Sequence, residues 1–371
     1  GDEEALARAL QRGIVLAIGL SVIASVALLP AGWVLARFDQ PPEVVPLAAA
    51  YARATIPGVL PFYLFVVARQ TLQALGRVRA ILWILVAANL ANIVLNWLLV
   101  FGNLGFPHLG AVGSAWASSL TRMGMAAGLF WISWPLLRRH LRPWRVGVLA
   151  RIPMTRMIRL GAPIGAHVFL EFSAFGIAGL MAGWVGTVAV AGHQVALTLA
   201  SLTFMIPMGV GQATAVLVGR AVGRGDSEAA RRAGVGGLGI GVASMAMTAG
   251  AFLLFPDALA RLFSDDVQVV QLAAALLPIA GAFQVADGIQ VVAAAILRGI
   301  GDTRVPMLIN FAGFYAVALP VGAILSFEAD LGAEGIWWGL ASGLGVVAAL
   351  LIVRVARRSS GELERVRIDE A

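Results

Sequence analysis

The chain has 371 residues, of which 60% are hydrophobic and only 13% charged, and its formal net charge is +7. An average soluble domain carries about 25% charged residues, so this composition excludes an ordinary soluble protein and a disordered one. There is no cysteine and no lysine, which excludes disulfides, thiolate metal sites, Schiff-base lysines and a P-loop.

Ten apolar runs are long enough to cross a membrane as helices, which takes about 20 residues each. In chain order they cover residues 13–36, 46–75, 80–101, 111–137, 157–183, 187–218, 233–255, 268–297, 305–327 and 335–353. None shows the alternation over about ten residues that is typical of a membrane β-barrel. The sequence therefore predicts an all-α polytopic membrane protein.

Arginine is distributed unevenly between the loops. Twenty-two of the 27 arginines lie in alternate loops, most densely at 138–159, whereas the opposite loops hold only Arg37 and Arg261. Because basic residues are retained on the cytoplasmic side, the arginine-rich loops are predicted to be cytoplasmic. We expect the connection at 138–159 to lie against anionic lipid headgroups.

An internal repeat relates the two halves of the chain at an offset of 222 to 225 residues. The matches run in order from Gly1-Asp2 with Gly225-Asp226, through Leu72, Gly76 and Arg79 with Leu297, Gly301 and Arg304, to Gly110, Gly113 and Trp116 with Gly332, Gly335 and Trp338. Single matches carry no weight, but an ordered series at one offset indicates a duplication.

The repeat predicts two lobes related by an axis along the membrane normal, with a cavity between them. Because residue 1 aligns with residue 225 and the second copy starts near 152–157, we expect about 70 residues and two spans to be absent before Gly1. Half of one cavity wall would then be missing, and transport by this chain alone is not expected. The predicted organisation is a partial N-lobe at 1–145, a basic cytoplasmic linker region at 146–156, a C-lobe at 157–356 and a charged cytoplasmic tail at 357–371.

Two segments resemble a known family. They are AGHQVALTLASLTFMIPMGVGQATAVLVGRAVGRGDSEAARRA at 191–233 and FQVADGIQVVAAAILRGIGDTRVPM at 283–307. As a set they are similar to the multidrug and toxin extrusion (MATE) transporters, closest to the NorM-type branch. The resemblance covers essentially the whole chain and implies a MATE-like two-lobe fold with ten of its twelve transmembrane helices present.

Glu171 and Asp287 are the only two acids that fall inside predicted spans. A carboxylate at the centre of a membrane helix costs roughly 2.5–3.5 kcal/mol, so it requires a compensating role. Glu171 lies 12 residues after Arg159 and Asp287 lies 11 before Arg298, which places both about 16–18 Å from the cytoplasmic edge. The pattern favours a cation or proton site that also faces cationic drugs, and the alternative is a pair of structural carboxyls. The resemblance implies the former, with Na⁺ or H⁺ at these two acids, because NorM-type members place cation-linked acids at the matching positions.

Four further polar residues are candidates for supporting roles. His167 lies one turn before Glu171 and could share a proton with it, or could simply pack between helices. Asn92 and Asn96 are four residues apart, and their amides suit either Na⁺ or helix packing. The sequence favours packing for the two amides, whereas the resemblance implies a polar site in the N-lobe. Arg122 lies 11 residues into its span and could neutralise a carboxylate.

Two expectations concern the spans at 157–183 and 187–218. His193 and Gln194 lie near the outer end of the span at 187–218, where we expect interfacial hydrogen bonding. Aromatic and methionine side chains could line an adaptable drug cavity, but packing or lipid contact is the favoured interpretation. These residues are Phe169, Phe172, Phe175, Met181, Met205 and Met208.

The residues and the resemblance together favour a secondary active multidrug efflux antiporter that exports cationic amphipathic compounds in exchange for Na⁺ or H⁺, with no cofactor. The alternative is a lipid-linked oligosaccharide flippase of the same superfamily, whose pyrophosphate headgroup would need several arginines in the cavity. A membrane enzyme is disfavoured because the four histidines share no motif spacing, and a receptor is disfavoured because it would not need a two-lobe duplication. The expected partners are small-molecule drugs or dyes and membrane lipid, not nucleic acid, for a monomer in the bacterial inner membrane.

Overall fold

The computed structural model describes residues 3–37, 43–359, 361 and 363. These residues form helices joined by short turns, and no β-strand occurs among them. Helices satisfy their backbone hydrogen bonds internally, as a bilayer requires. The all-α fold class is therefore confirmed, whereas most of the charged tail predicted at 357–371 lies outside the described residues.

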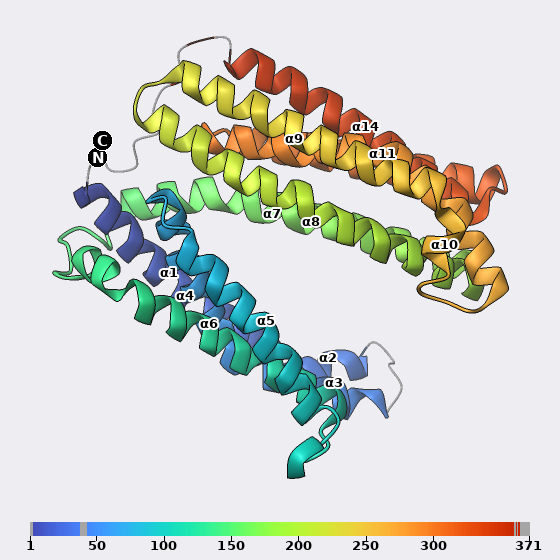
Figure 1. The fold of residues 1–371 in the computed structure, drawn as a ribbon, viewed down its shortest axis with the longest axis horizontal. Helices are drawn as coiled ribbons and strands as arrows, with labels where there is room; N and C mark the ends of the chain where they lie inside the picture. Colours follow the sequence, from blue (N-terminus) through green and yellow to red (C-terminus); the bar gives the residue numbers. More distant parts are fainter. Residues whose placement is uncertain (1–2, 38–42, 360, 362, 364–371) are drawn as a thin grey trace. The chain divides into compact units, whose positions relative to one another are not determined.

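The chain divides into two compact units, Gly1–Met154 and Thr155–Ala371 (Figure 1). The helices of the N-terminal unit are α1 (Glu3–Leu28), α2 (Ala31–Arg37), α3 (Val44–Thr55), a 3₁₀ turn (Ile56–Gly58), α4 (Val59–Ala74), α5 (Arg79–Leu99), a second 3₁₀ turn (Asn103–Gly105) and α6 (Gly110–Leu141). Within this unit α6 packs against α3, α4 and α5. A buried cluster around Phe65, Leu72 and Leu129 joins α1, α4, α5 and α6.

The C-terminal unit is arranged around one central helix. Its elements are α7 (Arg151–Val185), which begins just before the boundary, α8 (Thr187–Gly223), α9 (Ser227–Leu254), α10 (Pro256–Ala260), α11 (Val267–Gly299), α12 (Arg304–Phe311), α13 (Leu319–Ala323) and α14 (Gly332–Ser359). Helix α11 contacts α8, α9 and α14 (Figure 1). Because most of its residues are apolar and many of them are buried, α11 can be covered by other helices on several sides.

The predicted span at 305–327 is continuous but not uniformly α-helical. Wide π-helical turns at Ala312–Ala318 and Ile324–Glu328 flank α13. Pro320, at the start of α13, has no N–H to donate to the preceding turn, which favours such local rearrangement.

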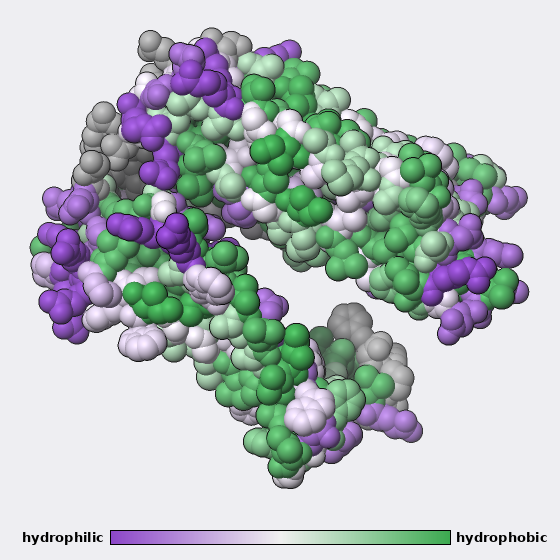
Figure 2. All heavy atoms as spheres, in the orientation of Figure 1, coloured by the Kyte–Doolittle hydropathy of each residue, from purple (hydrophilic) through white to green (hydrophobic). Residues whose placement is uncertain are grey.

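Nine helical segments of the described residues are long and apolar enough to span a membrane. The tenth predicted span, 111–137, is the long helix α6, which is not among the nine because Arg122 and its serine, glycine and tryptophan residues lower its hydropathy. The first predicted span, 13–36, was placed too late: α1 begins at Glu3 and ends at Leu28, before Pro30. The chain is a multi-pass membrane protein. Figure 2 shows hydrophilic residues gathered at the helix ends and apolar residues along the helices between them.

The basic connection between the two units is shorter than the sequence predicted. Helix α6 continues to Leu141 and α7 begins at Arg151, so the residues predicted as linker at 151–156 are helical. The amide of Gln11 on α1 donates to the carbonyl oxygens of His140 (2.9 Å) and Pro143 (3.1 Å). Its oxygen accepts from the backbone N–H of Arg145 (2.9 Å). The start of the connection is therefore fixed to the protein.

Candidate functional site

The two acids of the predicted spans come together in the C-terminal unit. Glu171 lies near the middle of α7 and Asp287 lies two-thirds of the way along α11. Asp287 is 7% exposed, and the Glu171 side chain is 13% exposed. Both are thus largely withdrawn from solvent, where an unpaired carboxylate is costly, so the surroundings must satisfy their oxygens.

Gln290 satisfies both acids with a single amide group. Its Nε2 donates to Glu171 Oε1 (2.8 Å) and to Asp287 Oδ1 (3.2 Å). The residue lies three positions after Asp287 on α11, so the two share one helix face, and it is almost completely buried. Gln290 was not predicted as a site residue. Its spacing of three residues from Asp287, which places both on one face of a helix, is the sequence signal that points to it.

His167 stands on the other side of Glu171. Its Nε2 is 3.8 Å from Glu171 Oε2, beyond hydrogen-bonding range but close enough for an electrostatic interaction, and its ring also faces the backbone of Pro306. The guanidinium of Arg298, in the last turn of α11, acts electrostatically on both Glu171 and His167. A permanent positive charge therefore acts on Glu171 and offsets part of the negative charge of that carboxylate.

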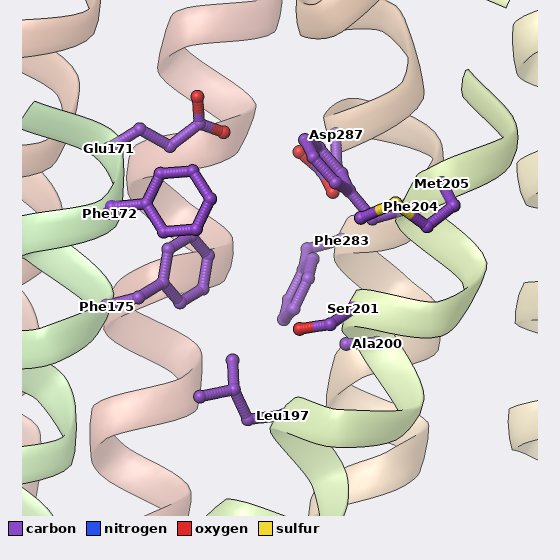
Figure 3. Close-up of a pocket in the computed structure, with 10 residues that line it drawn as sticks. All are labelled: Glu171, Phe172, Phe175, Leu197, Ala200, Ser201, Phe204, Met205, Phe283 and Asp287. Atoms are coloured by element: carbon purple, nitrogen blue, oxygen red, sulfur yellow. The ribbon is translucent and has the colours of Figure 1, made fainter. Parts of the chain in front are cut away.

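A pocket of about 170 Å³ opens from the acids between α7, α8 and α11 (Figure 3). In Figure 3, Glu171 and Asp287 lie at one end, on helices that face each other across the pocket. The other lining residues are Phe172, Phe175, Leu197, Ala200, Ser201, Phe204, Met205 and Phe283. Phe172, Phe175 and Met205 thus line a pocket, although packing was the favoured interpretation for them. Of the other residues in that set, Met181 is buried in the core and Phe169 is exposed.

The pocket wall formed by Phe283 is supported from behind by Trp337 of α14. The two rings stack with centroids 5.7 Å apart, and Trp337 Nε1 donates to His193 Nδ1 (3.1 Å). His193 is only 2% exposed, so the predicted interfacial role was wrong for this residue. His193 is buried because Trp337 of α14 packs against this part of α8. The neighbouring Gln194 is exposed.

A second glutamine of α11 lies one turn before Asp287 and has a complete set of partners. Gln284 donates to Thr203 Oγ1 of α8 (3.1 Å), and its Oε1 accepts a short hydrogen bond from Thr248 of α9. It joins three helices beside the pocket without touching either acid. Gln284 is thus the fully paired counterpart of Gln290.

The two asparagines of α5 form a smaller polar group in the N-terminal unit. Asn96 donates to the Asn92 side-chain oxygen (3.1 Å) and backbone oxygen (2.8 Å), and Asn92 donates to Thr121 Oγ1 of α6 (3.1 Å). The hydrogen bond from Asn92 to Thr121 joins α5 to α6, which is the helix-packing role that the sequence favoured for these amides.

Arg122 does not meet the expected carboxylate. Its guanidinium carbon lies 5.2 Å from the centroid of the Phe62 ring, a cation–π geometry. None of the ion pairs found within the described residues includes Arg122, so its predicted neutralising role has no partner there.

The donor atoms at the acidic pair fit a hard monovalent cation. The two carboxylates provide hard oxygen ligands, which suit Na⁺ and do not suit soft metals. Among the described residues, no group of three or more His, Cys, Asp and Glu side chains could hold a metal ion. A proton bound to one of the acids is the other species that this arrangement could carry.

Comparison with known proteins gives one consistent result. A family model described as MatE matches residues 1–98 and 163–324. The chain is 38% identical over 362 residues to the probable multidrug resistance protein NorM of Mesorhizobium japonicum, covering 95% of this chain and 77% of that protein. It is also 38% identical over 355 residues to the multidrug resistance protein NorM of Burkholderia vietnamiensis, covering 94% and 76%.

Solved structures agree on the fold. The eukaryotic MATE transporter AtDTX14 superposes with a TM-score of 0.85 at 22% identity, covering 98% of this chain and 82% of that one. An outward-facing multidrug resistance MATE family transporter gives a TM-score of 0.83 at 20% identity, covering 96% and 83%. The predicted family resemblance and fold are confirmed.

Proposed function

Because the chain belongs to the MatE family, we propose that it acts as a multidrug efflux antiporter, exporting cationic amphipathic compounds in exchange for Na⁺ or H⁺. The relatives named multidrug resistance proteins support the efflux activity. The observation that carries the finer proposal is the position of Glu171 and Asp287 at one end of an otherwise apolar, phenylalanine-rich pocket.

The pocket suits a bulky organic cation. Four phenylalanine side chains, Phe172, Phe175, Phe204 and Phe283, offer ring faces to a delocalised positive charge, and Met205 adds an adaptable apolar contact. The carboxylates attract the charge, while the apolar wall accepts rings and alkyl groups of varied shape. Breadth of substrate follows, because few directional contacts are required.

Exchange follows from competition for the same carboxylates. A drug cation and a coupling ion are both attracted to the negative charge of Glu171 and Asp287. Because they compete for the same carboxylates, binding of one favours release of the other. Transport results when the two ligands favour different conformations of the transporter, since a ligand shifts an equilibrium only by its differential affinity for the two states. No nucleotide motif is present, which agrees with a process driven by an ion gradient.

The flippase alternative is less well supported. A pyrophosphate headgroup would need clustered arginines, but the ten pocket-lining residues include two acids and no base. Among the described residues, Arg298 acts electrostatically on Glu171, and it is not one of the residues that line this pocket.

Binding of ethidium, a fluorescent cation, to the purified 371-residue chain in detergent would test the proposal. We expect Asp287→Asn and Glu171→Gln each to weaken ethidium binding at least tenfold and to abolish competition by Na⁺ or H⁺. Asn92→Leu, in the other unit, serves as the control and should bind ethidium within twofold of the unsubstituted chain. Ethidium binding that is unchanged in both acid variants, or displaced by a lipid-linked pyrophosphate, would contradict the proposal. Proteoliposomes with separate Na⁺ and pH gradients would then identify the coupling ion.

A further inference from the structure

Gln290 uses one half of its amide and leaves the other half unpaired. Its Nε2 donates to Glu171 Oε1 and Asp287 Oδ1, whereas its Oε1 is buried and has no hydrogen-bond partner. Buried side-chain acceptors are nearly always paired, so an orphan oxygen next to two acids needs a physical reason. Gln284, on the same helix, has both halves of its amide paired.

A second buried amide lies at a similar height in the C-terminal unit. His167 of α7 faces Pro306 of α12, and Ser173 of α7 hydrogen-bonds Tyr315 (2.6 Å), so Asn310 of α12 lies at about the level of Glu171. Asn310 is fully buried, and neither its oxygen nor its nitrogen has a partner. Unpaired polar atoms thus recur at the level of the acids.

The amide group of Gln290 can exchange its two ends without changing its shape. Its terminal torsion is broad and roughly two-fold, so half a turn places Oε1 where Nε2 now lies, facing both acids. In the present orientation the amide donates to two carboxylates. In the turned orientation it adds a third hard oxygen to those of Glu171 and Asp287, on two facing helices.

We propose that Gln290 sets the ion selectivity of the acidic pair, donating to both carboxylates when no metal cation is bound and turning its oxygen toward Na⁺ when one binds. This inference rests on the proposed cation-coupled function. A proton bound to a carboxyl is held by a covalent O–H bond and needs no cage of oxygens, whereas Na⁺ requires several oxygen ligands at once. The Gln290 oxygen therefore favours Na⁺ over H⁺ at the same two acids. Gln290 acts here as a specificity residue beside the acids.

Gln290→Met tests this inference, because it keeps a similar length and removes both the donor and the oxygen. Na⁺ binding to the purified 371-residue chain would be followed by isothermal titration and by the Na⁺-dependent rise in unfolding temperature, with choline chloride holding the ionic strength constant. We expect Gln290→Met to weaken Na⁺ binding at least tenfold, while protons still compete with ethidium for the two acids. Gln290→Glu, which keeps an oxygen at this place, should retain Na⁺ binding.

Gln284→Met is the matched control, since it removes an equally buried glutamine of α11 that touches neither acid. It should leave Na⁺ affinity within twofold, even where it lowers the unfolding temperature. Unchanged Na⁺ affinity in Gln290→Met, or an equal loss in Gln284→Met, would overturn the role of Gln290. A chain that responds to pH but never to Na⁺ would also overturn this inference while leaving the antiporter proposal intact. A chain that responds to neither ion would contradict the antiporter proposal itself.

Discussion

The two units of the chain have glycines with the same structural role at matching positions of the repeat. Gly113 on α6 and Gly335 on α14 occupy equivalent places, and a Cβ on either would lie 2.6 Å from a backbone carbonyl carbon, that of Leu99 or Leu325. Gly110 and Gly332, which open the same two helices, have φ of +52° and +54°, a conformation that only glycine adopts readily. The duplication therefore preserved sites where a side chain cannot fit.

The ends of α4 and α11 show the same conservation of backbone geometry. Gly76 and Gly301 both have positive φ, and the next residue donates back to the carbonyl five positions earlier, Arg77 to Leu72 and Asp302 to Leu297, each at 2.8 Å. This pattern is a helix C-cap that favours glycine.

The polar chemistry of the two units has diverged. Asp302 accepts hydrogen bonds from Nε (2.8 Å) and Nη2 (2.7 Å) of Arg354 on α14. At the matching place in the N-terminal unit, Arg77 and Ile132 line an open cavity of about 500 Å³. Likewise one unit holds a buried acidic pair and the other a pair of amides. Backbone contacts were thus retained in both units, while charged groups came to differ between them.

The largest expected effect is at Gly113 and Gly335, the equivalent glycines that the two units share. Gly335→Val and Gly113→Val should each prevent recovery of folded, monodisperse protein, because the new side chain would collide with backbone atoms that cannot move away. Gly345→Val on α14 and Gly124→Val on α6 are matched controls, since nothing lies within 4 Å of a Cβ there. Size-exclusion chromatography after detergent extraction measures the outcome. Normal recovery of Gly335→Val would show that α14 and the π-helical turn at Ile324–Glu328 can move apart without loss of the fold.

A smaller effect on stability is expected at Asp302 and Arg77, the equivalent positions at which the two units carry opposite charges. Asp302→Asn should lower the stability of the C-terminal unit by about 1–2 kcal/mol, since it removes the charge that Arg354 and Arg358 share, both of which are partly exposed and screened. Arg77→Ala, at the equivalent position, should change stability by less than about 0.5 kcal/mol, because no ion pair of Arg77 is found within the described part of the chain. Thermal unfolding in detergent compares the two variants. Equal shifts in unfolding temperature would remove this distinction between the units.

The smallest effect is expected at Arg122. Arg122→Gln should cost about 0.5–1 kcal/mol through loss of the contact with Phe62 and should leave Na⁺ and pH competition at the ethidium site within twofold. Unfolding temperature and competition binding on the same preparation provide both values. Loss of ion competition in this variant would restore the hypothesis that Arg122 neutralises a carboxylate, and would link the N-terminal unit to the acidic pair.

Much of the candidate site could be predicted because its signals are local in sequence. An acid inside an apolar run is conspicuous, so Glu171 and Asp287 were found directly. Gln290 and His193 were harder, because a neutral polar residue in a membrane helix faces either a protein neighbour or a polar boundary, and the sequence does not say which. The pocket phenylalanines were ambiguous for the same reason, since lipid and protein contacts favour similar side chains.

The sequence by itself determined the membrane class, the approximate helix positions, the duplication and the family, because each depends on composition or on order along the chain. Only the tertiary structure decided which face of each helix turns inward. Packing of α11 between α8, α9 and α14 buries Gln284 and Gln290 and brings Asp287 toward Glu171. Helix rotation is set by contacts between segments that are 36 to 119 residues apart, and these contacts leave no periodic signal in either segment alone.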